Sequence, residues 1–123
     1  MRKIRFRGKR ADSGEWMYGD LIRRYGMTGI YQPSGTIPII PETVGQFTGM
    51  KDRFGVDVYE GDILAVKDFY GNIKAKSVCT YSHGCFWLQN DEQRIILYRD
   101  LDFGEMQIIG NVHDNPEFIK SCL

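Results

Sequence analysis

Residues 43–66 read TVGQFTGMKDRFGVDVYEGDILAV, and this stretch says most about the fold. Its four glycines separate short apolar segments, a pattern typical of β-strands joined by tight turns. Residues 50–55 are predicted to form a turn with Gly55 in a left-handed conformation, and residues 60–62 are predicted to reverse the chain again. The following run, residues 63–66, is apolar on both faces, which indicates a central strand.

On the N-terminal side, the sequence predicts a β-hairpin followed by an irregular segment. Residues 3–9 alternate, with Ile4 and Phe6 on one face and basic side chains on the other. Residues 12–14 are turn residues, and residues 15–22 are predicted to form the second strand. Residues 23–41 contain three glycines and three prolines, so we expect irregular structure there, with short edge strands at 30–32 and 37–40.

On the C-terminal side, turn signals at regular spacing predict a meander. The expected strands are residues 63–66, 73–81, 85–89, 95–98 and 106–112, and Asn115-Pro116 is expected to begin a short helical turn. We therefore predict a mainly β protein. Residues 1–55 would form an N-terminal β-hairpin and irregular region, and residues 56–123 a small SH3-like β-barrel, together one cooperative unit.

Length and composition indicate a globular, intracellular chain. The chain has 123 residues, of which 42% are apolar, and no apolar run approaches the ~18 residues that cross a bilayer. The basic N-terminus lacks the apolar region of a signal peptide, so we expect a cytoplasmic protein with no membrane contact. Three cysteines are too few for a disulfide framework and predict free thiols.

The formal net charge is zero, which gives no global argument for nucleic-acid binding. The charge is nevertheless segregated, because six of the first ten residues are basic while acidic residues populate the tail. Three interpretations stay open: N- and C-terminal strands that neutralise each other, a basic surface for phosphate contacts, or a distribution without function.

Three segments together resemble the YopX family, small proteins of bacterial phages and prophages. They are residues 16–19 (WMYG), residues 41–63 with PETVGQFTGMKD and VYEGDI, and residues 108–117 (IIGNVHDNPE). The resemblance covers nearly the whole chain in order. It implies a prophage origin and a mainly β protein with a barrel-like C-terminal half. It implies no activity, cofactor or catalytic residue.

Cys79, His83 and Cys85 could begin a zinc site, with His113 or Cys122 as the fourth ligand that tetrahedral zinc requires. Their spacing matches no common zinc motif. Buried cysteine usually behaves as a small apolar residue, so we predict a packed pair of thiols and no metal or other cofactor.

Carboxylates of the central motif are predicted to have structural roles. Glu60 and Asp62 flank a glycine, where side chains usually accept hydrogen bonds from nearby backbone amides and only rarely do acid–base chemistry. Asp52, between Lys51 and Arg53, is expected in a solvated, turn-forming charge cluster. Residues 45–51 do not form a phosphate-binding loop, because the glycine spacing is short and an acid replaces the hydroxyl.

Aromatic and basic residues supply the candidate binding surface. An aromatic platform could include Phe69, Tyr70, Phe86, Trp87 and Tyr98, although aromatic residues at strand spacing are first of all core residues. The candidate binding residues are Arg5, Arg7, Lys74, Lys76 and Trp87.

The sequence favours a non-enzymatic module that binds a protein partner, and a homo-oligomer is a further option. The alternative is a nucleic-acid-binding protein that uses the basic N-terminal strand together with the face of Lys74 and Lys76. A small enzyme is the least favoured interpretation, because the sequence offers no nucleophile–base pair, metal-ligand set or nucleotide loop.

Overall fold

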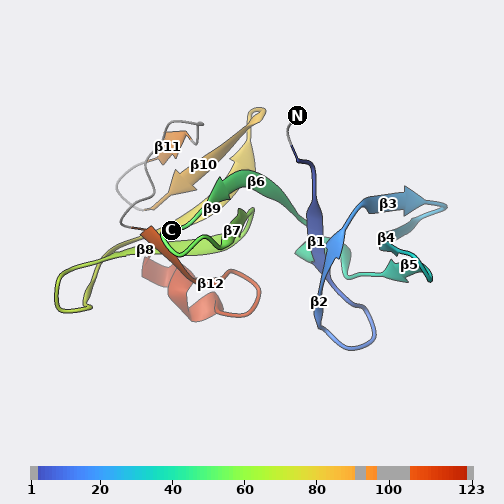
Figure 1. The fold of residues 1–123 in the computed structure, drawn as a ribbon, viewed down its shortest axis with the longest axis horizontal. Coiled ribbons are helices and arrows are strands. Elements are labelled where there is room, and N and C mark those ends of the chain that lie inside the picture. The colour runs from blue at the N-terminus through green and yellow to red at the C-terminus, as the bar shows by residue number, and fades with distance from the viewer. Residues whose placement is uncertain (1–2, 91–93, 97–105, 122–123) are drawn as a thin grey trace. The chain divides into compact units, whose positions relative to one another are not determined.

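The computed structural model of the chain describes residues 3–90, 94–96 and 106–121. It is mainly β, as predicted, with antiparallel strands and two short 3-10 helices (Figure 1). The chain divides into two compact units, Met1–Gly49 and Met50–Leu123. No helix in the described ranges is long and apolar enough to span a bilayer.

The first unit is built from two small antiparallel sheets. One has the strand order β2-β1-β6, and the other has the order β3-β4-β5. Strand β6 begins in this unit and ends in the second. The elements are β1 Phe6–Lys9, β2 Trp16–Gly19, β3 Leu21–Arg24, β4 Met27–Gln32, β5 Gly35–Pro38, η1 Pro41–Thr43 and β6 Gly45–Lys51.

Two predictions for this unit were wrong. The single strand expected at residues 15–22 is two strands in different sheets, because the chain breaks between β2 and β3 at Asp20. The segment expected to be irregular forms the sheet β3-β4-β5, in which the short strands expected at 30–32 and 37–40 fall within β4 and overlap β5. Most of its glycines and prolines lie in turns or at strand ends, while Gly29 lies inside β4. Pro38, for example, ends the edge strand β5, where a missing donor costs little.

Close approach of the two sheets forms the core of the first unit. Ile30 and Ile39 are buried, and a Cβ on Gly8 of β1 would collide with the Ile39 side chain. Only glycine allows this approach. The 3-10 helix η1 is tied to β1, because the Lys9 amide donates to Thr43 Oγ1 at 2.9 Å and the Ile40 amide donates to the Lys9 carbonyl at 2.8 Å.

The second unit contains a five-stranded antiparallel sheet with the order β11-β10-β9-β8-β12. Strand β7 lies outside this sheet and is hydrogen-bonded to β6. The predicted SH3-like barrel is not confirmed, since the described strands form no closed barrel and the sheet ends at β11 and β12. The elements are β7 Asp57–Tyr59, β8 Asp62–Lys67, β9 Ile73–Ser82, β10 Cys85–Gln89, β11 Arg94–Ile96, β12 Met106–Asn111 and η2 Pro116–Ser121.

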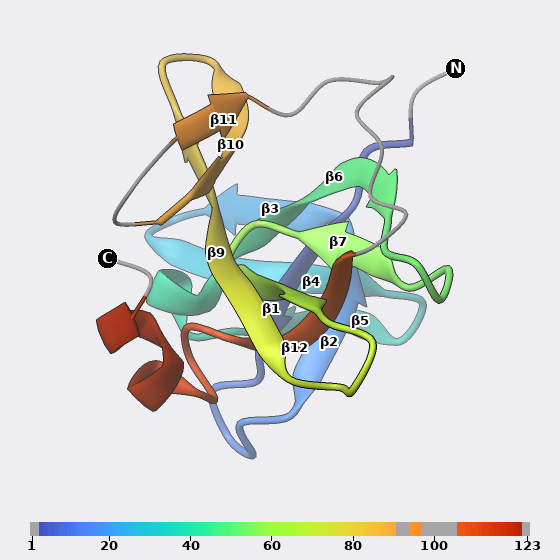
Figure 2. The same ribbon diagram turned by 90° about the vertical axis from the view of Figure 1, so that its left-hand side faces the viewer.

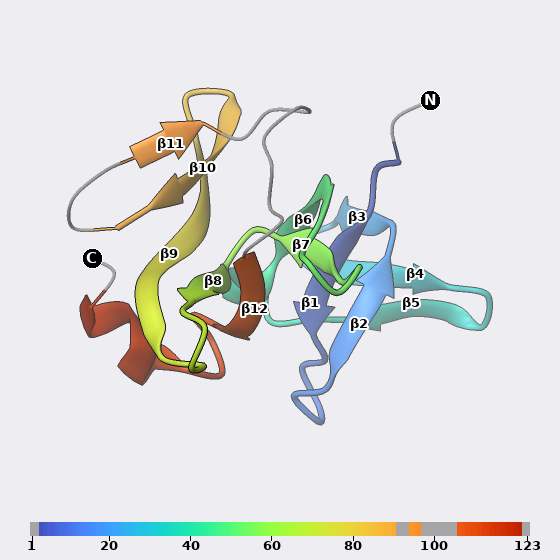
Figure 3. The same ribbon diagram turned by 60° about the vertical axis from the view of Figure 1, so that its left-hand side comes forward.

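The sheet of the second unit is covered by apolar residues on both faces. On one face Leu64 packs in a buried cluster with Val58, Cys79 and Leu88. On the other face Ile63 and Val78 pack against side chains that include Phe118 of η2, which lies beside β9 (Figures 2 and 3). Burial on both faces confirms the prediction that residues 63–66 form a central strand.

The glycine turns of the central motif are confirmed, but the solvated charge cluster is not. Gly55 has φ 80° and Gly61 has φ 94°, both in the region that favours glycine. Asp52 is buried, contrary to expectation, because its carboxylate accepts three backbone hydrogen bonds. The donors are the amides of Phe54 at 2.8 Å, Val56 at 3.0 Å and Ile108 at 3.1 Å.

Candidate functional site

The five binding residues predicted from the sequence fall into two groups. Arg5 and Arg7 belong to the first unit, whereas Lys74, Lys76 and Trp87 belong to the second. Arg7 was expected on the polar face of its strand, but it is only 6% exposed. Its guanidinium carbon lies 4.5 Å from the centroid of the Trp16 ring, so an aromatic ring takes the place of water around it.

Neighbouring cations repeat this arrangement along β1 and β2. The register sets Arg7 opposite Tyr18 and Lys9 opposite Trp16. Arg5 lies 5.4 Å from the Tyr18 ring centroid, and the Lys9 ammonium lies 5.5 Å from that of Trp16. These cation–ring contacts join the basic N-terminal strand to β2 and help to hold the hairpin together.

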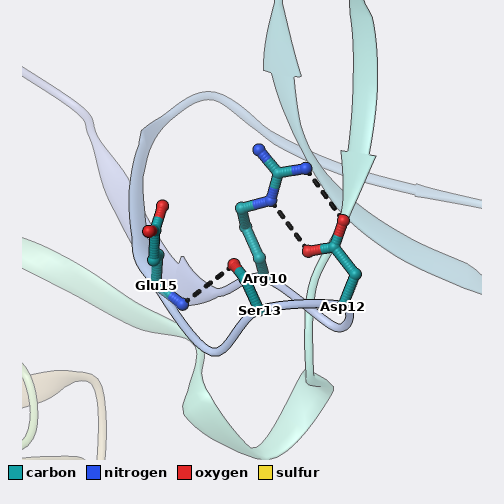
Figure 4. A network of polar contacts seen from close by, with 4 residues as sticks. All are labelled: Arg10, Asp12, Ser13 and Glu15. Atoms are coloured by element: carbon teal, nitrogen blue, oxygen red, sulfur yellow. Dashed lines mark hydrogen bonds and ion pairs between the residues drawn. The ribbon is translucent and has the colours of Figure 1, made fainter.

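An ion pair neutralises charge within the same hairpin (Figure 4). Arg10 donates two hydrogen bonds to Asp12, from Nε to Oδ1 and from one terminal nitrogen to Oδ2, both at 2.9 Å. Hydrogen bonding and charge attraction within this pair raise the pKa of Arg10, and the hydrogen bond from Arg10 lowers the pKa of Asp12. The turn is completed by Ser13 Oγ, which accepts from the Glu15 amide at 3.3 Å. The positive charge of Arg10 is thus neutralised by a carboxylate within the same hairpin.

Lys76 and Trp87 lie on one face of the five-stranded sheet, because side chains alternate from Lys76 to Thr80 along β9 and Trp87 pairs with Thr80. Lys74 lies at a bulge of β9, where the register against β8 shifts, so alternation does not assign it to this face. The Lys76 ammonium lies 5.5 Å from the Phe118 ring centroid, and Trp87 Nε1 donates to the Ser82 carbonyl at 2.9 Å. Of the three predicted residues in this unit, the strand pairing thus brings Lys76 and Trp87 to one face.

The wider aromatic platform is wrong. Phe86 lies on the opposite face from Trp87, packs against the buried cluster, and makes an edge-to-face contact with Tyr81 at 5.1 Å between ring centroids. Tyr98 lies outside the described residues. Phe69 and Tyr70 are placed elsewhere, in the turn between β8 and β9.

This turn, residues 68–72, presents the most exposed aromatic pair among the described residues, and we call it the aromatic tip (Figure 1). Phe69 is 99% exposed and Tyr70 is 87% exposed. Their ring centroids are 6.0 Å apart, with an angle of 82° between the rings. A turn between the strands at residues 63–66 and 73–81 was predicted, but its two aromatic side chains were assigned to an aromatic platform on the sheet. A turn signal directly around two aromatic residues was the sign that they would project from the fold.

Asp68 fixes the backbone of the aromatic tip. Its Oδ1 accepts hydrogen bonds from the amides of Tyr70 and Asn72, both at 2.9 Å. The Asp68 carbonyl accepts from the Gly71 amide at 3.0 Å, and its own amide donates to the Asn72 carbonyl at 2.8 Å. Four hydrogen bonds therefore hold the five residues in one conformation, with both rings directed outward.

The Asp68 carboxylate is expected to titrate below the ordinary value for aspartate, about 3.9. The hydrogen bond from the Asn72 amide, followed by that from Tyr70, lowers its pKa. A lowered folded-state pKa stabilises the fold above the unfolded-state value, and this contribution is lost as the pH falls through the folded value. Nuclear magnetic resonance should show a depressed carboxyl titration and, in step with it, a loss of protection of the Tyr70 and Asn72 amides relative to their intrinsic exchange rates at each pH.

Asp68→Asn is the control for this prediction, because it keeps an acceptor oxygen and cannot titrate. Amide exchange in this variant should not follow the acid titration seen in the wild-type turn. A wild-type Asp68 that titrates at or above the ordinary value would contradict the role given to its hydrogen bonds.

The structure separates the cysteines considered for zinc. Cys79 pairs with Leu88 and Cys85 pairs with Ser82 across β9 and β10, so the two thiols lie on opposite faces. Cys79 is buried in the core, and the Cys85 thiol lies 3.7 Å from the His83 carbonyl. The predicted packed pair of thiols is therefore wrong. No group of three or more potential metal ligands occurs within the described ranges, and Cys122 lies outside them.

The carboxylate of Asp62 has the structural role that was predicted. Asp62 is buried, and its Oδ2 accepts a hydrogen bond from the Tyr59 amide at 2.7 Å. It thereby closes the turn that leads into β8. Together with Asp52, it is engaged in holding backbone amides of the central motif.

Comparisons with known proteins give a family and a fold. The family model described as YopX protein matches residues 5–120. No curated protein matches the chain. The crystal structure of protein EF1440 from Enterococcus faecalis is similar, with a TM-score of 0.56 and 21% sequence identity. The match covers 97% of this chain and 99% of that one, and at this identity it shows a shared fold alone.

Proposed function

Since this chain belongs to the YopX protein family, we propose that it is a phage- or prophage-encoded binding protein without enzymatic activity. Its second unit would dock on a protein partner through the aromatic tip. The observation that carries this proposal is the exposure of Phe69 and Tyr70 on a turn held by Asp68. The prophage origin is what the family resemblance implies.

Aromatic side chains at a rigid tip suit protein recognition. Rings of this size bury roughly 150–250 Å² each when covered, and aromatic residues are enriched among those that contribute most to protein interfaces. Because the Asp68 hydrogen bonds order the turn before binding, less conformational entropy would be lost on association. Neither ring packs into the core, so the fold itself does not account for their presence.

The non-enzymatic part of the proposal rests on how the carboxylates are used. Asp52 and Asp62 are buried carboxylates of the central motif, and both accept backbone hydrogen bonds. Acid–base work would require such a group to face a substrate. Here the carboxylates face the turns that they stabilise.

The test is capture of host proteins by the tagged chain from phage-induced bacterial cells, with and without nuclease. Replacing both Phe69 and Tyr70 with serine should reduce nuclease-resistant capture at least about tenfold, since residues central to interfaces contribute about 2 kcal/mol or more. Tyr25→Asn is the matched control, because Tyr25 is a similarly exposed tyrosine at another hairpin tip. Capture that survives the double substitution, or that falls equally in the control, would refute docking through this tip.

A further inference from the structure

The hairpin between β3 and β4 ends in a turn whose sequence its backbone does not favour. Arg24 pairs with Met27, which leaves Tyr25 and Gly26 as a two-residue turn. Tyr25 has φ 54° and Gly26 has φ 76°, the combination of a type I′ turn. Asparagine or glycine is preferred at the first position, and a bulky residue there is strained.

Packing does not explain this tyrosine either, because Tyr25 is 97% exposed. Asparagine at this position would give a more stable turn than a strained and fully exposed aromatic residue does. Strain retained at such a position points to a function of the side chain. The observation that motivates the inference is therefore the combination of positive φ, full exposure and an aromatic ring.

Two arginines directly precede Tyr25. Arg23 and Arg24 are both exposed, and the Arg24 guanidinium carbon lies 6.0 Å from the Tyr25 ring centroid. Neither makes an ion pair with a carboxylate in the part of the chain that the structure describes. Arg10, by contrast, forms an ion pair with Asp12, and the side chain of Arg7 is buried.

The first unit as a whole carries a positive formal charge, like Arg23 and Arg24. Residues 1–49 contain eight basic and four acidic residues, whereas residues 50–123 contain eight basic and twelve acidic residues. The zero net charge of the chain therefore conceals a formal charge of +4 on the first unit. A surface of this sign attracts polyanions.

A second exposed ring lies on the same sheet. Side chains alternate along β4, so Met27 and Tyr31 share a face, and Arg24 joins them because it pairs with Met27. Tyr31 is 53% exposed. Residues 27 and 31 are separated by about 13 Å along β4. A single-stranded nucleic acid would cover this distance with more than one nucleotide.

We infer that the tip of the β3–β4 hairpin binds single-stranded nucleic acid. One base would stack on Tyr25, Arg24 would contact phosphates, and the nucleic-acid strand would continue over Tyr31 on the face that Arg24 shares with Met27. An exposed ring beside a cation suits an unpaired base, whereas the paired bases of a duplex hide their faces. The inference is independent of protein docking by the aromatic tip, because it concerns other residues in the other unit.

The test uses the full chain and a fluorescein-labelled oligothymidylate in an anisotropy titration. The wild type should bind, with an affinity that falls as salt rises. Tyr25→Asn should weaken binding by roughly 5- to 150-fold, the range expected for loss of one stacked base. Changing Arg24 to glutamine should weaken binding and reduce the slope of log affinity against log salt by about 0.7.

Two controls separate this site from folding and from protein docking. Tyr25→Asn should unfold at the same temperature as the wild type or higher, because asparagine suits the turn. Tyr70→Ser should keep wild-type affinity for the oligonucleotide. The inference fails if the wild type does not bind, if a duplex binds as tightly, if Tyr25→Asn binds like the wild type, or if Tyr70→Ser loses as much affinity. Loss of nuclease-resistant protein capture in Tyr25→Asn would also overturn it, since the tip would then be a protein site.

Discussion

Asp52→Ala is expected to lower the free energy of unfolding by about 3–5 kcal/mol, a large share of the 5–15 kcal/mol typical of a small protein. The substitution would leave three amides without their acceptor, those of Phe54, Val56 and Ile108. A donor that loses its partner away from water costs about 1–3 kcal/mol, and these three hydrogen bonds are part-buried. The Ile108 amide is the decisive one, because it joins the turn to β12 across 56 positions of sequence.

Urea denaturation of three variants would measure this effect. Asp52→Asn should lose less than Asp52→Ala, because its carbonyl oxygen can still serve the turn while its amide group opposes the Ile108 donor. Asp57→Ala removes a carboxylate from the same hairpin that is paired with Lys51 at 2.7 Å near solvent. That change should cost no more than about 1 kcal/mol. Equal losses for Asp52→Ala and Asp57→Ala would show that the buried carboxylate does not hold the motif together.

Asp52 also shows where sequence reasoning ends. Period-two alternation and turn glycines are local signals, and they correctly predicted the strand at residues 85–89 and the positive φ of Gly55 and Gly61. Lys51 and Arg53 beside Asp52 suggested a solvated cluster, because the amide of Ile108 is distant in sequence. Burial that depends on a partner distant in sequence cannot be predicted from the neighbouring residues.

The candidate sites divide in the same way. Lys74 and Lys76 were grouped from their spacing on one strand, but that strand bulges at Lys74. The grouping of Phe86 with Trp87 ignored that neighbouring residues point to opposite faces. Tyr25 was missed because its surroundings are rich in glycine and proline, which suggested an irregular segment. Once Arg24 is paired with Met27, the same residues become a tight hairpin with one exposed ring.

The second large effect is expected at Gly61, where substitution by valine should cost about 2–4 kcal/mol of unfolding free energy. Gly61 has φ 94°, and a β-branched side chain at such an angle is a genuine outlier. The backbone has little room to relax, because the Gly61 amide donates to the Cys79 carbonyl at 2.8 Å and its carbonyl accepts from the Val112 amide at 2.9 Å. A shift that relieved the valine would break a link to β9 or to the chain after β12.

Gly14→Ala provides the comparison, because Gly14 also has a positive φ, 76°, but lies in an open hairpin turn. A Cβ built there meets no atom within 4 Å, so only the backbone preference of about 1 kcal/mol should be lost. Paired urea melts should therefore place the midpoint of Gly61→Val well below that of Gly14→Ala. If Gly61→Val unfolds at the wild-type midpoint, the turn into β8 is not held by its hydrogen bonds. The glycine of the YEGD segment would then need an explanation other than the fold.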